Sequence, residues 1–347
     1  MADAATLKTP ELADVLDARR LIAPYLDPTP LRRYPLLDEA LDAEVLLKHE
    51  NHLPTGAFKV RGGINLVGRL EPDPRAAGVC AASTGNHGQS VGYAASLFGV
   101  AATIFVPVGA NPVKVVAMRS LGAEVVEHGA DFDDARERCA EVAAETGARY
   151  IHSGDEPLLI AGVATATLEV LEREPEIEAI IVPVGGGSGA AGACIAAKAI
   201  REGIEVIGVQ SDAAPAAYRA WHERRLVQDE MHTFAEGLQT RVAFALPQRI
   251  LTEHLDDFVL VSDDELRAAT LRLLEITRNL IEPAGAAPLA AATKLQARFA
   301  GKKLALICSG GNINPAQLRE LLDWGAEARP SGHSAPLSLR GSPARRR

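Results

Sequence analysis

The chain has 347 residues, of which 47% are hydrophobic, and this is enough to build one or two domains with buried cores. Its formal net charge of −9 argues against a nucleic-acid partner, because phosphate backbones repel an acidic surface. No apolar run approaches the roughly 20 residues that span a bilayer. The first five residues lack a basic region followed by an apolar one, so no export signal is predicted.

The four cysteines stand singly in apolar segments, with no C-x-x-C pair among them. Buried free thiols of this kind are typical of proteins kept in a reducing compartment. We therefore expect a cytoplasmic protein with neither a nucleic-acid nor a membrane partner, and with free thiols at Cys80, Cys139, Cys194 and Cys308.

Short apolar runs alternate with amphipathic segments along most of the chain, which predicts an α/β fold with a mostly parallel sheet covered by helices. Glycines that end helices just before new strands support this pattern. The predicted strands are residues 44–49, 79–83, 101–107, 124–129, 149–152, 179–184, 205–210, 258–262 and 303–308.

A lysine at a helix start is the first candidate site. Residues 48–62 read KHENHLPTGAFKVRG, in which a strand is broken at Pro-Thr-Gly and a helix is predicted to begin near Phe58. Lys59 would then lie in a crowded turn beside an aromatic ring and the positive end of a helix. Partial desolvation there lowers the pKa of an amine, as a lysine that bonds covalently to a carbonyl group requires. The alternative is an ordinary surface lysine.

A polar turn before a helix is the second candidate. Residues 83–90 read STGNHGQS, follow a predicted strand and lead into a helix predicted at 88–98. Ser83 or Thr84 can cap this helix with a side-chain oxygen. The exposed backbone amides at the helix start also suit a carboxylate ligand. His87 on its own would be a structural histidine, and its place in this turn makes it a candidate for binding.

A glycine-rich turn is the third candidate. Strand residues 180–184 run into GGGSGAAG at 185–192, and a helix is predicted at 193–201. Consecutive glycines let backbone N–H groups turn inward, and the following helix adds its positive end, so a phosphate can be held without side-chain charge. A dinucleotide site would need this motif in an early βαβ unit. Asp212 lies at a suitable distance for that alternative, but the motif occurs midway along the chain.

Two further candidates lie towards the end of the chain. Residues 304–312 read LALICSGGN, which predicts a buried strand that ends in a polar turn at Ser309. Glu282, in the run IEPAG, precedes a proline and fits the first turn of a helix, where the helix dipole stabilises a negative charge.

Taken in order, the motifs around Lys59, Asn86, Gly185 and Ser309 resemble those of the threonine dehydratase and serine racemase family, whose members are fold type II enzymes that use pyridoxal 5′-phosphate (PLP). The resemblance implies that Lys59 carries the cofactor, that Asn86 bonds its phenolic oxygen and that Ser309 bonds its pyridine nitrogen. The glycine turn would hold the phosphate, with Ser188 in place of the family's fourth glycine. Residues 83–87 would hold the substrate carboxylate.

The same resemblance extends to neighbouring positions, with Phe58 beside the ring and Glu282 near the cofactor edge. The implied cofactor-binding residues are Phe58, Lys59, Asn86, Gly185, Gly186, Gly187, Ser188, Gly189, Glu282 and Ser309. The implied substrate-binding residues are Ser83, Thr84, Asn86 and His87.

The resemblance also implies two subdomains, each with a mostly parallel sheet covered by helices. Residues 1–52 together with 150–325 would form the larger PLP-binding subdomain, and residues 53–149 the smaller one. Residues 326–347 are polar, basic and rich in proline, glycine and serine, which predicts a disordered tail. Family members are commonly dimers or tetramers, so a homo-oligomer is expected.

The implied reaction is elimination from a β-hydroxy amino acid, most simply L-threonine or L-serine, to give a 2-keto acid and ammonia. Lys59 would release the cofactor to the substrate amine and then remove the α-proton as a general base. A hydroxyl at Ser309, where other PLP enzymes place a carboxylate, would leave the ring nitrogen unprotonated and favour prompt loss of the β-hydroxyl. Substrates such as 3-hydroxyaspartate differ only beyond Cβ, where Arg241 could hold an acidic group or form an ordinary salt bridge.

Racemisation is the main alternative, because Thr84 keeps a hydroxyl where the family's racemase uses a serine. The metal site of that racemase is not expected, since Gln210 and Ala216 stand where acidic residues would be. A β-replacement synthase is less well matched, because such enzymes usually place aspartate after the lysine and this chain has Val60. A non-catalytic relative that only binds PLP is the remaining alternative, against which the retained motifs argue.

Overall fold

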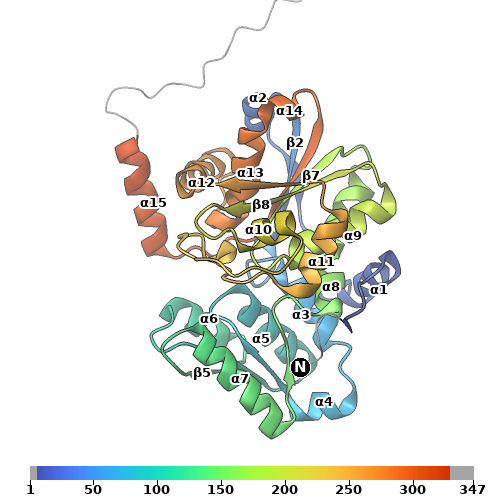
Figure 1. The fold of residues 1–347 in the computed structure, drawn as a ribbon, viewed down its shortest axis with the longest axis vertical. Coiled ribbons are helices and arrows are strands. Elements are labelled where there is room, and N and C mark those ends of the chain that lie inside the picture. Colours follow the sequence, from blue (N-terminus) through green and yellow to red (C-terminus); the bar gives the residue numbers. More distant parts are fainter. Residues whose placement is uncertain (1–5, 329–347) are drawn as a thin grey trace, which may run out of the picture.

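The computed structural model describes residues 6–328, which are built around two sheets (Figure 1). The larger sheet has the strand order β1-β2-β10-β7-β8-β9, and every pairing in it is parallel except that of β1 with β2. Its strands are β1 (Leu31–Arg33), β2 (Glu44–His49), β7 (Ala179–Pro183), β8 (Glu205–Ser211), β9 (Asp257–Val261) and β10 (Lys303–Cys308).

The smaller sheet has the order β5-β4-β3-β6 and is parallel throughout. It occupies the lower part of Figure 1. Its strands are β3 (Val79–Ala82), β4 (Ala102–Val106), β5 (Glu124–Glu127) and β6 (Arg149–Tyr150).

Helices cover both faces of both sheets. In the first half of the chain they are α1 (Leu12–Ile22), α2 (Pro35–Leu41), α3 (Lys59–Val67), α4 (Pro72–Ala77), α5 (Asn86–Phe98), α6 (Pro112–Ser120), α7 (Phe132–Thr146) and α8 (Pro157–Arg173). In the second half they are α9 (Ser188–Ile200), α10 (Ala216–Glu223), α11 (Ala245–His254), α12 (Asp263–Thr277), α13 (Pro283–Lys294), α14 (Gln296–Phe299) and α15 (Pro315–Ala328). Two short 3₁₀ turns are η2 (Glu50–His52) and η3 (Glu236–Leu238).

The core follows this layering. One apolar cluster lies between the larger sheet and α8 and α9, and a second lies on its other face beneath α12 and α13. A third cluster joins the smaller sheet to α3 and α5. Among residues 6–328, no helix is both long and apolar enough to cross a membrane.

Three glycines bring the backbones of α3, α8 and α9 into direct contact. A Cβ on Gly62 would lie 2.8 Å from the carbonyl oxygen of Leu159, and one on Gly162 would lie 2.6 Å from the carbonyl oxygen of Arg61. A Cβ on Gly192 would lie 2.9 Å from the backbone nitrogen of Ala164. Larger side chains cannot enter these contacts, so the spacing of the three helices is set by main-chain atoms.

The α/β prediction is confirmed, and each predicted strand is present with ends shifted by at most two residues. The edge strand β1 was not predicted, because three residues are too few to show an alternating pattern. The prediction for α9 was wrong at its start: the helix begins at Ser188 rather than Ala193. Gly187 adopts φ 85° and turns the chain directly into the helix, so more than half of the glycine-rich run is helical.

The predicted subdomain boundaries stay a prediction, because α3 packs against both α5 and α8 and so contacts both regions. The tail prediction was wrong for residues 326–328, which belong to α15. The chain keeps helical hydrogen bonding there despite its composition. The rest of the predicted tail, residues 329–347, lies outside the described residues.

Candidate active site

Lys59 is the first residue of α3, and its ammonium group joins two other segments. Its Nζ donates to the carbonyl oxygen of Ser153, 2.8 Å away, and to Oγ of Ser188, 2.7 Å away. The ring of Phe58 lies 5.4 Å from the same nitrogen. Burial lowers the pKa of Lys59 from 10.5 to about 7, because the protein interior disfavours the charged amine. A large neutral fraction near pH 7 makes this lysine a nucleophile and a base.

The glycine turn after β7 presents a row of unpaired amides. Among the described residues, the backbone N–H groups of residues 185–190 find no hydrogen-bond acceptor. The other side of the turn is filled: a Cβ on Gly186 would lie 2.2 Å from Cε2 of Phe244, and one on Gly185 would lie 2.3 Å from the carbonyl oxygen of Gly237. The turn and the start of α9 therefore form a cradle for an anion.

The turn before α5 has a second set of unpaired amides. Ser83 Oγ accepts from the N–H groups of Gly85 and Gly88, at 3.2 and 2.9 Å, and so caps the helix. Within residues 6–328, the N–H groups of Thr84, Asn86 and His87 make no hydrogen bond. Three free amides at a helix start suit the carboxylate of a small ligand. Of the two predicted caps, Ser83 is used and Thr84 is not.

Asn86 links the turn before α5 to the larger sheet. Its Nδ2 donates to Oε1 of Glu282 at 2.9 Å, and its Oδ1 accepts from Nδ2 of Asn312 at 2.7 Å. The second proton of Asn312 Nδ2 goes to the carbonyl oxygen of Thr55, 2.8 Å away. Burial raises the pKa of Glu282, and Lys114 and the Asn86 hydrogen bond act in the opposite direction. Glu282 is also the N-cap residue of α13, one position before the first turn in which it was predicted, and its role at the cofactor edge stays a prediction.

Ser309 follows β10 and is buried beside the start of α3. Its carbonyl oxygen accepts from the N–H of Phe58 at 2.9 Å, which ties the end of β10 to the turn that carries Lys59. Its hydroxyl makes no hydrogen bond with another described residue. Ser309 therefore offers a hydroxyl that no other described residue binds, at the end of the strand that is tied to the Lys59 turn.

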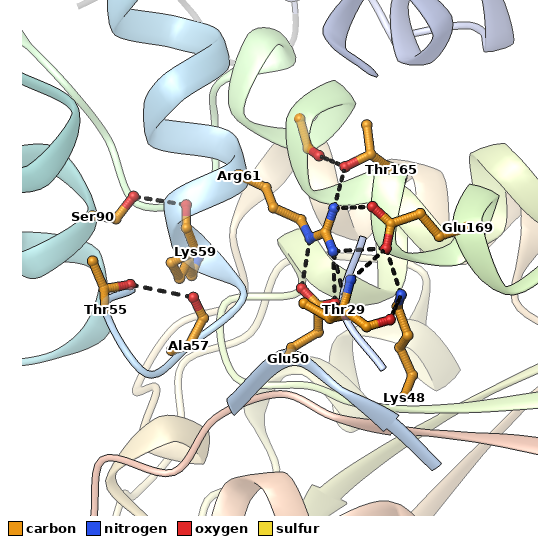
Figure 2. A network of polar contacts seen from close by, with 11 residues as sticks. Thr29, Lys48, Glu50, Thr55, Ala57, Lys59, Arg61, Ser90, Thr165 and Glu169 are labelled. Atoms are coloured by element: carbon orange, nitrogen blue, oxygen red, sulfur yellow. Dashed lines mark hydrogen bonds and ion pairs between the residues drawn. The ribbon is translucent and has the colours of Figure 1, made fainter. Parts of the chain in front are cut away.

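A buried ion cluster holds α3 in place. Arg61, two residues after Lys59, donates to both carboxylate oxygens of Glu50, at 2.6 and 2.9 Å, and to both of Glu169, at 2.6 and 2.9 Å. Lys48 also pairs with Glu169. Figure 2 shows these four charges meeting between β2, α3 and α8. Because the two positive charges match the two negative ones, the cluster is neutral, and it fixes the helix start that positions Lys59.

A sequence model for pyridoxal-phosphate-dependent enzymes matches residues 22–310 of the chain. The chain belongs to the family of PLP-dependent enzymes. Its architecture is that of the fold type II members, and its cofactor is PLP.

Several relatives of this PLP enzyme are ammonia-lyases. It is 36% identical to L-threonine ammonia-lyase of Thermotoga maritima, over 90% of this chain and 78% of the relative. It is 33% identical to L-threo-3-hydroxyaspartate ammonia-lyase of Saccharomyces cerevisiae, over 90% of this chain and 96% of the relative.

Solved structures of PLP enzymes give the same picture. A threonine deaminase from T.th. is 39% identical and superposes with a TM-score of 0.83, over 88% of this chain and 99% of that one. Serine racemase of Dictyostelium discoideum is 32% identical with a TM-score of 0.83, over 88% of this chain and all of that one.

The residues of the candidate site fit PLP. The unpaired amides of residues 185–190 match a phosphate, and Lys59, with its lowered pKa, lies next to them through Ser188. In this PLP enzyme, Lys59, Asn86, the glycine turn and Ser309 come from four separate segments and meet at the carboxyl ends of strands β2, β3, β7 and β10. The individual roles assigned to these residues stay predictions.

His87 is placed differently from its neighbours in the turn. Its imidazole is buried, and its Nε2 lies 3.1 Å from the carbonyl oxygen of Ile151. Burial lowers the pKa of His87 to about 3, and the ring is therefore neutral. Nδ1 is buried with no hydrogen-bond partner among the described residues, and in a neutral ring that donates through Nε2 it can only accept, so the backbone N–H of His87 is the donor that a carboxylate could use.

Several residues of the candidate site had no role predicted for them. Ser153 accepts from Lys59, Asn312 orients Asn86, and Phe244 fills the back of the glycine turn. The ring of His152 packs edge-on against Phe244 at 4.7 Å. The run HSGD after a predicted strand was the only available indication for His152 and Ser153.

Replacing Gly186 with aspartate is expected to lower the affinity for PLP by on the order of 100-fold or more, because its Cβ would collide with Phe244 and displace the turn, and its carboxylate adds a negative charge beside the phosphate cradle. Titration of the cofactor-free protein with PLP, followed by absorbance, measures the effect. Gly186→Ala tests the steric part alone, since its Cβ would meet Phe244. Gly203→Asp is the control, because a Cβ there has open space. Unchanged affinity in Gly186→Asp would place the phosphate elsewhere.

Proposed function

We propose that the chain catalyses α,β-elimination from a β-hydroxy amino acid, L-threonine and/or L-serine, to yield a 2-keto acid and ammonia. The observation that carries the proposal is the position of Lys59, whose pKa is about 7, beside the phosphate cradle, where its amine donates to Ser188. The similarity to L-threonine ammonia-lyase of Thermotoga maritima and to the threonine deaminase from T.th. supports the choice of substrate.

PLP, when bound, supplies a carbonyl carbon for the substrate amine and a ring that withdraws electrons from Cα. The protein residues do the rest. The amides of residues 84, 86 and 87 hold the substrate carboxylate and thereby fix the orientation of Cα. Nζ of Lys59, neutral in part at pH 7, accepts the α-proton. The Ser309 hydroxyl is too weak an acid to protonate the pyridine nitrogen of PLP. The ring then withdraws electrons less strongly, which favours prompt loss of the substrate β-hydroxyl.

Keto-acid and ammonia release from L-threonine, L-serine and 3-hydroxyaspartate tests the proposal directly. Activity with at least one neutral β-hydroxy amino acid is the expected result. A protein that binds PLP with a visible absorption band but releases no keto acid from any of them would contradict it.

Racemisation is the second candidate, because the Thr84 hydroxyl is free of other described residues and a serine racemase is among the similar structures. A proton donor on the face of the substrate opposite Lys59 could invert Cα. A metal at the racemase position has less support: Oε1 of Gln210 accepts from the N–H of Tyr218 at 3.0 Å, and Ala216 offers no ligand. A β-replacement synthase and a non-catalytic relative are supported by no specific contact among the described residues.

We expect keto acid and ammonia to be the main products from L-serine, with D-serine a minor product. Thr84→Ala should remove the D-serine while elimination is largely kept, because Ser83 rather than Thr84 caps α5 and the turn should stay ordered. Chiral chromatography beside an ammonia assay measures both, with and without a chelator, which should change little. A yield of D-serine above that of keto acid would make the chain a racemase.

We also propose that the protein is cytoplasmic and forms a homo-oligomer, either a dimer or a tetramer. The four cysteines are all buried free thiols, which supports a reducing compartment. Light scattering coupled to gel filtration measures the assembly, and a monomer at micromolar concentration would contradict the proposal.

A further inference from the structure

An ion pair crosses from the smaller-sheet region to the larger one at the substrate side of the site. Lys114 on α6 pairs with Glu236 in η3; the Lys114 side chain is 12% exposed and that of Glu236 is 34% exposed. The second oxygen of Glu236 accepts from Nε2 of Gln317 on α15 at 2.7 Å. Gln317 is itself held by Asn314, through a bond from its own N–H at 2.9 Å. Both oxygens of Glu236 are therefore occupied by fixed donors.

The pair faces the turn that would hold the substrate carboxylate. The atom nearest to a Cβ placed on Gly85 is Nζ of Lys114, at 3.9 Å. Glu282, which accepts a hydrogen bond from Asn86, is close enough to interact with both charges. Lys114 lowers the pKa of Glu282, and Glu236 raises it. The next residue after Glu236 is also close, since a Cβ on Gly185 would meet the carbonyl oxygen of Gly237. Lys114 and Glu236 therefore lie between the carboxylate turn and the phosphate cradle.

Other basic groups near this position are neutralised. Arg241 lies 3.5 Å from Asp133 and is half exposed, so the structure supports the salt-bridge interpretation of this residue. Burial lowers the pKa of both His87 and His152, which favours their neutral forms. Of these described groups, Lys114 is then the cation that could meet an acidic group on the substrate, and Glu236 already compensates its charge.

We propose that Glu236 is a specificity-determining residue that keeps Lys114 from binding an acidic substrate side chain, so that the site selects neutral β-hydroxy amino acids over 3-hydroxyaspartate. A β-carboxylate would place a second negative charge beside Glu236, and the repulsion costs affinity in a shielded site. The inference rests on the proposed function and adds the substrate class to it.

Glu236→Gln tests the inference with little change in shape. The hydrogen bond from Gln317 can be kept by the amide oxygen, while the charge that neutralises Lys114 is lost. We expect the ratio of kcat/KM for L-threo-3-hydroxyaspartate to that for L-threonine to rise on the order of 10-fold. Adding Lys114→Met to Glu236→Gln should return the kcat/KM ratio to its original value, because the freed Lys114 ammonium is the group that binds the β-carboxylate.

Asp133→Asn is the matched control, because it breaks another ion pair between the same two regions and frees Arg241 instead. In Asp133→Asn, the ratio of kcat/KM for L-threo-3-hydroxyaspartate to that for L-threonine should stay unchanged. A rise in Asp133→Asn without one in Glu236→Gln would assign the acidic side chain to Arg241 and overturn the inference. An unchanged ratio in both variants would also overturn it.

A binding measurement separates this inference from the proposed function. L-aspartate and L-2-aminobutyrate carry no β-hydroxyl, so their binding to the PLP-loaded protein can be followed by the change in cofactor absorbance without elimination. Glu236→Gln should improve binding of L-aspartate relative to L-2-aminobutyrate, again on the order of 10-fold. If the protein consumes neither L-threonine nor L-threo-3-hydroxyaspartate, the proposed function fails. The ratio of the affinities for L-aspartate and L-2-aminobutyrate still decides the role of Glu236.

Discussion

Replacing Lys59 with alanine is expected to abolish the visible absorption band of bound PLP and to reduce turnover by roughly 10³-fold or more. The variant removes both the covalent attachment point and the base next to the substrate. It should stay folded, because the start of α3 is held by Arg61 rather than by Lys59. Absorbance measures the band, keto-acid release measures turnover, and circular dichroism measures the fold. Borohydride reduction followed by peptide mapping identifies the lysine that carries the cofactor.

Lys294→Ala is the control for this experiment, since its amine is half exposed and contacts Glu265 at 3.4 Å on the outside of the larger sheet. It should keep both the absorption band and the activity. Borohydride-trapped cofactor on a different lysine in the Lys59 variant would show that Lys59 is not the attachment point.

Arg61→Met is expected to lower the free energy of unfolding by about 3–5 kcal/mol, because it leaves the carboxylates of Glu50 and Glu169 buried without their main partner. Urea unfolding with saturating PLP in all samples measures the change while ligand linkage is kept constant. The exposed fractions of Arg61 and Glu50 are 1% and 0%, so solvent cannot screen the remaining charge.

Arg19→Met gives the comparison. Arg19 pairs with Glu172, one turn along α8 from Glu169, but about half of each side chain is exposed. Its loss should cost no more than about 1 kcal/mol. Equal losses in the two variants would mean that the Arg61 cluster contributes no more than a surface ion pair.

The parts of the fold and site that follow from local sequence were predictable. Each predicted strand is present, and Lys59 and the glycine turn were found because a strand, a turn and a helix start place them within a few residues. The Arg61 cluster was not, since Arg61 and Glu169 are 108 residues apart and only the packing of α8 on α3 joins them. The same holds for Lys114 and Glu236, which belong to different sheet regions.

The direction in which a side chain points could not be predicted from the sequence either. The turn before α5 was correctly placed. Whether the His87 ring contacts a ligand or Ile151 depends on where β6 ends, and this is set by tertiary packing. The start of α9 was placed too late because glycine disfavours helices on average. At Gly192 that preference is outweighed by the close approach of α8, which only a residue without a side chain permits.

Because of the glycine contacts among α3, α8 and α9, the cofactor side of the site should tolerate substitutions less well than the substrate side. Lys59 begins α3 and Ser188 begins α9, so main-chain contacts at Gly62, Gly162 and Gly192 set the distance between the amine and the phosphate cradle. Any larger residue at these positions should shift that distance. The substrate side is bordered instead by long side chains such as those of Lys114 and Glu236. New substrates are therefore reachable by exchanging those side chains, with the cofactor geometry left as it is.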